Sequence, residues 1–328
     1  MSPLKYSNRF ISGVYISTFI AGHNGMVGHA VLRAGIEQGH DLLTINRADL
    51  DLRDAQAVSN FLQKNRPTNI VLAAAKVGGI YANLSHKREF LTENLEIQNS
   101  VILGALNAGV KKLIFLGSSC IYPKHASQPM REDSLLTGPL EPTNEGYALA
   151  KISGVKLCQY VREETGLDYF SLMPTNLYGP GDNFHSKNSH VPAALMRKFH
   201  EAKKANTSTV KIWGSGNAMR EFMHVDDLAD AIWFAIANPP KEHLMNVGFG
   251  SEISIKDFAQ KIAKIVAFQG ELEFDTSMPE GTPRKLLDPT KLFELGWRPK
   301  ISLESGLEST YRWFSENFES GAVRGYDK

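Results

Sequence analysis

The chain has 328 residues, of which 42% are hydrophobic and 22% are charged, and its formal net charge is +1. This length allows one large domain or two moderate ones, and the near-neutral charge gives no reason to expect nucleic acid or a membrane surface as a partner. No apolar run reaches the roughly 18 residues of a transmembrane helix. Residues 1–12 lack the pattern of a signal peptide, and the only cysteines are Cys120 and Cys158, so we expect a cytoplasmic protein with free thiols.

Strands and helices are predicted to alternate through the first half of the chain. We expect strands at residues 15–21, 41–46, 69–75, 112–118 and 169–173, and helices that end near residue 38 or span residues 91–107 and 147–165. This alternation is typical of parallel strands that are covered on both faces. The sequence therefore predicts an α/β fold with a doubly wound parallel sheet of the Rossmann type.

The predicted elements become shorter in the second half of the chain. We expect helices at residues 191–205 and 226–237 and strands at residues 210–213 and 244–248. Ser254 can cap a further helix together with Asp257, three residues later. Asp288-Pro289 opens a short helix that Gly296 ends. We expect this half to form a smaller α/β lobe.

Three glycines follow the first predicted strand at the spacing Gly-x-x-Gly-x-x-Gly. Glycine lets the backbone turn sharply and approach a pyrophosphate, and the next helix offers free N–H groups and the positive end of its dipole. We interpret the segment as a dinucleotide-binding loop, whose residues are Gly22, His23, Asn24, Gly25, Met26, Val27 and Gly28. We therefore assign residues 1–180 to a dinucleotide-binding domain, to which later segments can return, and residues 181–328 to a substrate-binding lobe.

The end of the second predicted strand indicates which dinucleotide is bound. A carboxylate at this place would hold the 2′-hydroxyl of NAD(H) and repel the 2′-phosphate of NADP(H). The chain has Asn46 and Arg47 there, whereas Asp49 and Asp51 lie beyond the expected end of the strand. Because a guanidinium suits a phosphate, we expect NADP(H) as the cofactor.

Tyr147 and Lys151 are separated by about one helical turn, so they share a helix face. An ammonium beside a phenol is expected to lower the phenol pKa and to make it a better proton donor. Ser118 ends a predicted strand and can hold the same carbonyl oxygen. We interpret Tyr147, Lys151 and Ser118 as the residues that protonate a ketone oxygen while hydride reaches its carbon.

Cys120 and His190 are two further candidates for proton transfer. Cys120 lies where a strand should end at the carboxyl edge of the sheet, and His190 follows a polar loop. A thiol and an imidazole have ordinary pKa values of about 8.5 and 6.5, so each can give or take a proton near neutral pH. Placed on opposite faces of a bound ketone, they would invert the acidified carbons beside it. The histidines and cysteines show no metal-ligand spacing, so we expect no metal.

These motifs resemble those of the GDP-L-fucose synthases, which are extended short-chain dehydrogenase/reductases. The resemblance runs from about residue 19 to residue 314. It rests on the segments AAAKVGGI at 73–80, LGSSCIYP at 116–123, PTNLYGP at 174–180, DNF at 182–184, SHV at 189–191, WGSG at 213–216 and GTPRK at 281–285.

The resemblance implies conversion of GDP-4-keto-6-deoxy-D-mannose to GDP-L-fucose with NADPH. Cys120 as base and His190 as acid would invert C3 and C5, and the Tyr147 set would serve the reduction at C4. The implied cofactor contacts, besides the glycine loop, are Asn46, Arg47, Ala74, Leu116, Gly117, Ser118, Ser119, Lys151, Pro174, Thr175, Asn176, Leu177 and His190. The implied substrate contacts are Lys198, Trp213, Arg220 and Glu280. A homodimer joined by a helix bundle of residues 91–107 and 147–165 is also implied.

Three alternatives remain open at this point. A related epimerase/reductase of the colitose type, acting on a 3,6-dideoxy 4-keto sugar nucleotide, would need almost the same pocket and would invert only C5. A sugar-nucleotide dehydratase or C4-epimerase uses the same scaffold, but dehydratases carry an acidic pair where this chain has Cys120-Ile121. A non-catalytic NADP-binding sensor is the alternative outside enzymes, although the chain retains the complete Tyr, Lys and Ser set.

Overall fold

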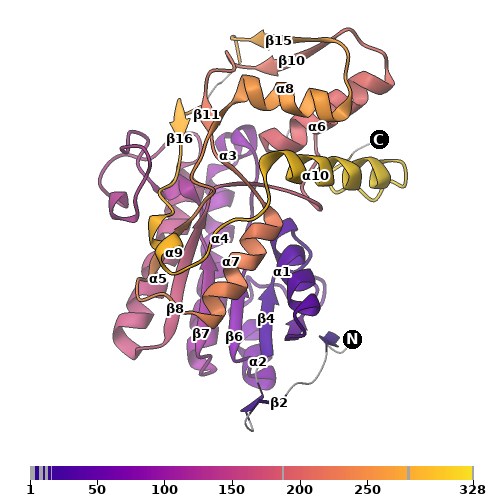
Figure 1. Cartoon of the computed structure of the whole chain (residues 1–328). Helices are drawn as coiled ribbons and strands as arrows, with labels where there is room; N and C mark the ends of the chain where they lie inside the picture. The colour runs from indigo at the N-terminus through magenta and orange to yellow at the C-terminus, as the bar shows by residue number, and fades with distance from the viewer. Residues whose placement is uncertain are drawn as a thin grey trace.

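The structure of the protein is a computed structural model that describes residues 4–6, 10–11, 14–15, 17–186, 188–278 and 281–326. A sheet of seven strands with helices on both faces forms its lower part in Figure 1, and a smaller group of elements stands above it. Three buried apolar clusters correspond to this division, with one on each face of the sheet and one in the smaller group.

The main sheet has the order β1-β5-β4-β6-β7-β8-β13, and its strands run parallel except for β1 at the edge. The strands are β1 (Leu4–Tyr6), β4 (Ser17–Ala21), β5 (Asp41–Thr44), β6 (Asn69–Leu72), β7 (Lys112–Leu116), β8 (Asp168–Pro174) and β13 (Leu244–Val247). The strand order reverses at β4, which has β5 on one side and β6 on the other. In such sheets, ligands bind outside the carboxyl ends of the strands at this switch point.

Apolar side chains alternate along the strands, so neighbouring residues enter opposite cores. Phe19 and Leu113 lie in one core, whereas Ile20 and Ile114 lie in the other. The first core is covered by α2 (Ala55–Asn65), α4 (Lys87–Asn107) and α5 (Glu145–Thr165), and the second by α1 (Met26–Glu37) and α7 (Val225–Ala237). This arrangement confirms the predicted doubly wound parallel sheet.

The third core belongs to the smaller lobe at the top of Figure 1. It is formed by α6 (Val191–Lys204), α8 (Ile255–Val266), α10 (Leu303–Phe318) and the parallel pair β10 (Thr209–Trp213) and β15 (Glu271–Asp275). Ser254 caps α8: its hydroxyl accepts a hydrogen bond from the Asp257 N–H at 3.0 Å and donates to the Asp257 carboxylate at 2.6 Å. The predicted capping interaction is therefore confirmed.

The remaining elements are short. They are β2 (Phe10–Ile11), β3 (Val14–Tyr15), α3 (Ile80–Ser85), β9 (Asn176–Tyr178), β11 (Met219–Arg220), β12 (Phe222–His224), β14 (Ile253–Ser254), β16 (Arg284–Lys285) and α9 (Thr290–Glu294). The helices α2 and α10 and the strand β15 have no counterpart in the sequence prediction. The elements α7 and β13 come from the half assigned to the substrate lobe but build onto the main sheet; the boundary near residue 180 stays a prediction.

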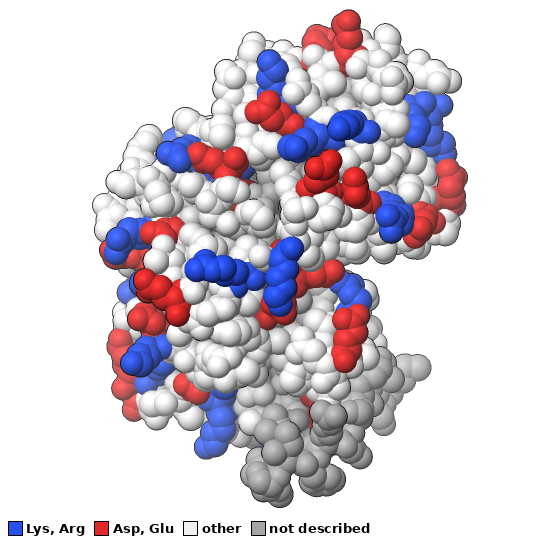
Figure 2. All heavy atoms as spheres, viewed as in Figure 1, with Lys and Arg blue, Asp and Glu red and all other residues white. Residues whose placement is uncertain are grey.

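The surface carries both signs of charge. Figure 2 shows Lys and Arg side chains interspersed with Asp and Glu on the face that it presents, in keeping with the formal net charge of +1. Within the described ranges, no helix combines the length and the apolar character that a membrane crossing requires.

Asn246 on β13 ties the segment that follows Cys120 to the main sheet. The Asn246 side chain is fully buried; its Oδ1 accepts a hydrogen bond from the Tyr122 hydroxyl at 2.6 Å. Its Nδ2 donates to the carbonyl oxygens of Met130 at 2.9 Å and Asp288 at 3.1 Å. These bonds hold the loop after Cys120 in one place, because a buried polar group left without its partner costs about 1–3 kcal/mol.

We expect Asn246→Leu to lower the free energy of unfolding by about 3 kcal/mol, because the Tyr122 hydroxyl and two carbonyl groups lose their buried partner. Urea unfolding followed by circular dichroism measures the change. The matched control is Asn238→Leu at the exposed end of α7, which should change stability by less than about 1 kcal/mol. Equal urea midpoints for the two variants would contradict the role of Asn246.

Candidate functional site

Four neighbouring parallel strands bring their carboxyl ends to one edge of the sheet, and candidate residues follow each of them. Gly22 follows β4, Ala74 lies shortly after β6, Ser118 lies shortly after β7, and Thr175 follows β8. Segments that are far apart in the sequence therefore meet at the switch point of the strand order. Each of these residues was among the candidates named from the sequence.

The glycine loop is packed too tightly for side chains at two positions. A Cβ on Gly22, whose φ is +96°, would lie 2.7 Å from the Ala74 nitrogen, and a Cβ on Gly28 would lie 2.1 Å from the Gly22 oxygen. Gly25 is the N-cap of α1 without a side chain to cap it, and the first helical turn, which begins with Met26 and Val27, contains no acidic residue. Free N–H groups and the positive helix end thus face the loop, which fits the pyrophosphate of a dinucleotide.

His23 and Asn24 lie beside Asn46, which follows β5. The Asn24 side-chain amide donates a hydrogen bond to Asn46 Oδ1 at 3.2 Å. Burial lowers the pKa of His23, and a side-chain hydrogen bond with Asn46 opposes this change. The loop after β4 and the segment after β5 are therefore joined at the place predicted to hold the adenosine ribose.

Arg47 is exposed next to this junction and, in the part of the chain that is described, forms no ion pair within 4.0 Å. Asp51 is instead bound by Arg53 at 2.6 Å, and this contact lowers the pKa of Asp51 to about 2. The neighbouring carboxylate is thus occupied by another guanidinium. The contact of Arg47 with the 2′-phosphate of NADP(H) stays a prediction.

Lys151 connects α5 to the end of β7. Its ammonium donates a hydrogen bond to the Leu116 carbonyl oxygen at 2.7 Å and lies 5.7 Å from the centroid of the Tyr147 ring. Lys151 is only 3% exposed, and burial lowers its pKa to about 8, an effect that Cys120 opposes. The predicted shared face of Tyr147 and Lys151 is therefore present on α5.

The pKa of Tyr147 differs from the expectation that the neighbouring ammonium lowers it. Burial raises this pKa above its ordinary value, and the charge of Cys120 raises it further. The Lys151 ammonium is directed to the Leu116 carbonyl, so desolvation dominates at the phenol. Tyr147 therefore stays protonated at neutral pH, which is the form that can donate a proton.

Ser118 and Cys120 lie in the turn that follows β7. The Ser118 hydroxyl accepts a hydrogen bond from the Cys120 N–H at 3.4 Å and caps a short 3₁₀ turn over residues 119–121. Cys120 is 6% exposed, and burial raises the pKa of its thiol, while Lys285, Ser118 and Lys151 oppose this effect. Because Cys120 also acts electrostatically on Tyr147 and Lys151, these side chains form one cluster.

Lys285 is a member of this cluster that the sequence analysis missed. It lies on β16, which runs parallel to β11 with Lys285 opposite Arg220. Burial lowers the pKa of Lys285, whereas the charge of Cys120 raises it. The signal in the sequence was a cation inside the motif at residues 281–285, but nothing in the sequence alone indicates that this motif reaches the turn after β7.

His190 belongs to a different element from the thiol. It is the N-cap of α6 and is exposed, and among the described residues no hydrogen bond joins it to Cys120 or Tyr147. The buried carboxyl group of Asp182 interacts with His190 electrostatically; burial raises the pKa of Asp182, and His190 opposes this change. The structure thus places His190 at the start of a helix of the smaller lobe, while Cys120 follows a strand of the main sheet.

The other predicted cofactor residues lie at the ends of β7 and β8. Thr175 and Asn176 each donate a side-chain hydrogen bond to the Glu221 carbonyl oxygen, at 3.3 Å and 2.8 Å. The remaining members of this set are Leu116, Gly117, Ser119, Pro174 and Leu177.

Two of the predicted substrate residues, Lys198 on α6 and Trp213 on β10, belong to the smaller lobe. Lys198 donates a hydrogen bond to the Lys211 carbonyl oxygen at 3.0 Å, and its ammonium lies 5.7 Å from the centroid of the Trp213 ring. Burial lowers the pKa of Lys198, and the Trp213 side chain is 48% exposed. Arg220 lies on β11, whereas Glu280 lies outside the described residues.

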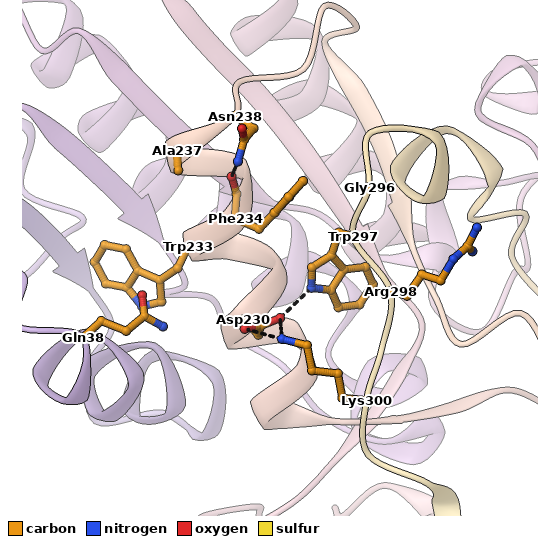
Figure 3. A pocket seen from close by; sticks show the side chains of 10 residues that line it. All are labelled: Gln38, Asp230, Trp233, Phe234, Ala237, Asn238, Gly296, Trp297, Arg298 and Lys300. Atoms are coloured by element: carbon orange, nitrogen blue, oxygen red, sulfur yellow. Dashed lines mark hydrogen bonds and ion pairs between the residues drawn. The ribbon is translucent and has the colours of Figure 1, made fainter.

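A separate groove of about 430 Å³ opens at the other end of the main domain (Figure 3). Asp230 on α7 accepts hydrogen bonds there from Trp297 Nε1 at 2.8 Å and from the Lys300 ammonium at 3.0 Å. Gln38 lines the groove and follows the last turn of α1, whereas the glycine loop precedes the first turn. The groove is therefore remote from the candidate site. No group of three or more His, Cys, Asp or Glu side chains that could hold a metal occurs in the described part of the chain.

We expect Lys285→Met to raise the pKa of Cys120, because the Lys285 charge is the strongest of the interactions that oppose the effect of burial on the thiol. At pH 8 the rate of Cys120 alkylation by iodoacetamide, followed by peptide mass spectrometry, should fall about tenfold. Lys285→Arg keeps the charge and should retain most of the rate. The control Lys261→Met, on the exposed side of α8, should leave the rate unchanged. Identical pH profiles for Lys285→Met and the native protein would contradict the assigned contact.

Comparisons with known proteins show the family to which the chain is similar. Residues 18–248 match the model of the NAD dependent epimerase/dehydratase family. The chain is 52% identical to a GDP-L-fucose synthase of Escherichia coli strain K12 over 310 residues, covering 91% of this chain and 96% of the relative. It is also 52% identical to GDP-L-fucose synthase 1 of Arabidopsis thaliana, covering 91% and 93%. It is 41% identical to a GDP-L-colitose synthase of Yersinia pseudotuberculosis, covering 90% and 96%.

Solved structures show the same fold. The crystal structure of a GDP-L-fucose synthetase of Naegleria fowleri bound to NADP is 28% identical with a TM-score of 0.85, covering 98% of each chain. A GDP-6-OMe-4-keto-L-xylo-heptose reductase of C. jejuni is 34% identical with a TM-score of 0.86, covering 92% of this chain and 98% of the other. On these identities and coverages, the chain belongs to the GDP-L-fucose synthases within the NAD dependent epimerase/dehydratase family.

Proposed function

We propose that the protein converts GDP-4-keto-6-deoxy-D-mannose to GDP-L-fucose by inverting C3 and C5 and then reducing the C4 ketone with NADPH. The observation that carries this proposal is the cluster at the end of β7, where the Lys151 ammonium lies 2.7 Å from the Leu116 carbonyl oxygen and interacts with Cys120. The cluster combines a protonated phenol, an ammonium, a hydroxyl and a thiol. A plain reductase needs no thiol of this kind at the site.

The inversion needs a base and an acid on opposite faces of the sugar ring. The Cys120 thiolate removes a proton from the carbon beside the ketone, and the hydroxyl groups of Ser118 and Tyr147 stabilise the negative charge on the enolate oxygen. His190 returns a proton to the opposite face, which inverts the carbon. The placement of His190 on the smaller lobe and of Cys120 on the main domain supports access from two sides.

The reduction uses the same oxygen-binding groups. NADPH, when bound, supplies the hydride that C4 receives. Tyr147 donates its proton to the C4 oxygen, and its raised pKa keeps the proton in place until charge develops on that oxygen. Lys151, fixed by the Leu116 carbonyl, provides the positive charge that stabilises the tyrosinate afterwards. Because one set of hydroxyls holds the oxygen in both steps, inversion and reduction share one binding position.

The substrate class is proposed from the smaller lobe and from the relatives. The Lys198 and Arg220 cations suit a diphosphate, and the exposed Trp213 ring suits stacking on a base. The second candidate is a colitose-type reaction on a 3,6-dideoxy sugar, since that relative is 41% identical. The identity of 52% to two fucose synthases favours the 6-deoxy substrate.

We expect Tyr147→Phe to abolish NADPH oxidation, because the proton donor for the C4 oxygen is lost, while solvent deuterium still enters C3 and C5. Cys120→Ser should first stop the deuterium exchange. Proton NMR of the sugar in heavy water measures exchange, and absorbance at 340 nm measures NADPH. Deuterium incorporation by Cys120→Ser at the native rate would show that another group is the base.

The same NMR experiment on the native protein tests the proposed function. Incubation with GDP-4-keto-6-deoxy-D-mannose and NADPH in heavy water should give GDP-L-fucose with deuterium at C3 and C5. Product from a 3,6-dideoxy keto sugar alone, with deuterium only at C5, would favour the second candidate. NADPH binding without turnover of either sugar would contradict both.

We also propose that the protein acts in the cytoplasm as a homodimer joined through α4 and α5. Both cysteines are free thiols, which supports a reducing compartment. Leu103 on α4 and Leu149 and Tyr160 on α5 are 44%, 42% and 51% exposed. Leu149 and Tyr160 lie about three helical turns apart and share a face. Such exposed apolar side chains on adjacent helices suit an interface.

We expect sedimentation equilibrium to give twice the chain mass of 36.3 kDa. Leu103→Glu should shift the protein to monomer, because it buries a charge at the interface. The control Leu295→Glu, on an exposed leucine that follows α9, should leave the mass unchanged. A native protein that stays monomeric at all concentrations would exclude this interface.

A further inference from the structure

Gly78 and Gly79 belong to the motif at residues 73–80, and the proposed reaction does not yet use them. They form the turn between β6 and α3, and Gly79 is the N-cap of α3. The φ of Gly79 is −66° and its ψ is 179°, a conformation that any residue adopts. Glycine is therefore required at position 79 because of the close approach of neighbouring atoms and not because of its backbone conformation.

Gly79 contacts the segment that leads into His190. Its N–H donates a hydrogen bond to the Asn188 carbonyl oxygen at 3.2 Å. A Cβ at position 79 would lie 2.9 Å from the Ser189 carbonyl oxygen, closer than side-chain carbons approach a backbone. His190 follows directly and caps α6, with its carbonyl accepting from the Ala194 N–H at 2.9 Å. The backbone of Gly79 thus sets where this segment enters α6.

Gly78 contacts Phe90, which packs against Tyr147, the other proposed proton donor. A Cβ at position 78 would lie 3.0 Å from Ala82 Cβ and 3.1 Å from Phe90 Cζ. Phe90 is 3% exposed, and its ring meets the Tyr147 ring edge-on with the centroids 6.4 Å apart. Gly78 is therefore linked to Tyr147 through Phe90, and Gly79 is linked to His190 through residues 188 and 189.

Asn83 holds the turn itself. Its side-chain amide donates hydrogen bonds to the carbonyl oxygens of Gly78 at 2.7 Å and Gly79 at 3.1 Å. The Asn83 side chain is 6% exposed, so both bonds are shielded from water. Neither glycine can move without breaking one of them.

We propose that the Gly78-Gly79 turn is a positioning element that sets the separation between Tyr147 and His190 across the sugar. The proposal rests on the proposed function, because it assigns both residues to one substrate. The absence of a side chain at position 79 lets residues 188–190 approach the main domain. A methyl group at position 79 pushes the Ser189 carbonyl outward and carries His190 with it. A shift of about 1 Å in a reacting group can lower the reaction rate by up to about 100-fold.

The experiment compares Gly79→Ala with Gly78→Ala, which adds the same methyl group one residue earlier. The nearest atoms to the methyl of Gly78→Ala are side-chain carbons of Ala82 and Phe90, so this variant disturbs the Tyr147 side of the turn. Deuterium exchange is expected to continue even in Tyr147→Phe, so exchange should be much less sensitive to Gly78→Ala than to Gly79→Ala. With NADP⁺ bound, Gly79→Ala should lower the turnover number for deuterium exchange about tenfold or more. Its KM for the keto sugar and its affinity for NADPH should change less than about twofold, as expected when only a reacting group is displaced. Gly78→Ala should keep more than half of the exchange rate.

Asn83→Ala tests the same turn without adding a contact and remains informative if Gly79→Ala does not fold. Asn83→Ala should also lower the rate of deuterium exchange by a larger factor than it lowers the affinity for NADPH. Native exchange rates in both Gly79→Ala and Asn83→Ala would overturn the positioning role. Losses of exchange, NADPH affinity and thermal stability in equal proportion would overturn it too, because they indicate a general structural defect. If the native protein itself exchanges no deuterium, it is the proposed function that fails.

Discussion

The hydrogen bond from the Lys151 ammonium to the Leu116 carbonyl, at 2.7 Å, is the contact on which the site depends. It joins the inner face of α5 to the last residue of β7, so the helix that carries Tyr147 is fixed against the strand that leads to Ser118 and Cys120. Apolar packing of α5 against β7 in the first core holds the two elements together as well. The doubly wound sheet supplies the edge, and this bond ties the catalytic face of the helix to the end of the strand.

Burial acts on every titratable group in this cluster, and the direction depends on the charge of the ionised form. It raises the pKa values of Tyr147 and Cys120 and lowers those of Lys151 and Lys285. The phenol of Tyr147 is thereby kept protonated. The thiol of Cys120 is harder to ionise, and the charges of Lys285 and Lys151 oppose part of this effect. The proposed role of Cys120 as a base therefore depends on Lys285 as well as on Lys151.

Sequence patterns predicted the elements that carry strong periodicity and clear caps. The six parallel strands of the main sheet, the glycine loop and the Ser254 cap follow from local residues alone, whereas the antiparallel edge strand β1 was not predicted. The helix α2 was missed, although Asp54 caps it by accepting from the Ala57 N–H at 3.0 Å and Val58 and Leu62 are buried. The Asp54 cap and the spacing of the buried residues are therefore the signals that could have revealed α2.

The long-range parts of the site were beyond prediction from residues in isolation. Lys285 lies on β16, which pairs with β11, and it interacts electrostatically with Cys120; no local pattern encodes that pairing. The raised pKa of Tyr147 depends on burial, which spacing along a helix does not reveal. Gly78 and Gly79 were recognised as part of a motif, but the approach of residues 188–189 that explains them appears only in three dimensions.

The central claim is that one sugar ring lies between the Cys120 sulfur and the His190 imidazole, with its ketone oxygen on Tyr147 and Ser118. A crystal structure with NADP⁺ and the keto sugar nucleotide bound tests this most directly. The account expects Sγ and the imidazole on opposite faces of the ring, within reach of C3 and C5, and the phenol within hydrogen-bonding distance of the C4 oxygen. A sulfur that faces away from the ring, with the phenol still on the oxygen, would contradict it and leave a simple reductase.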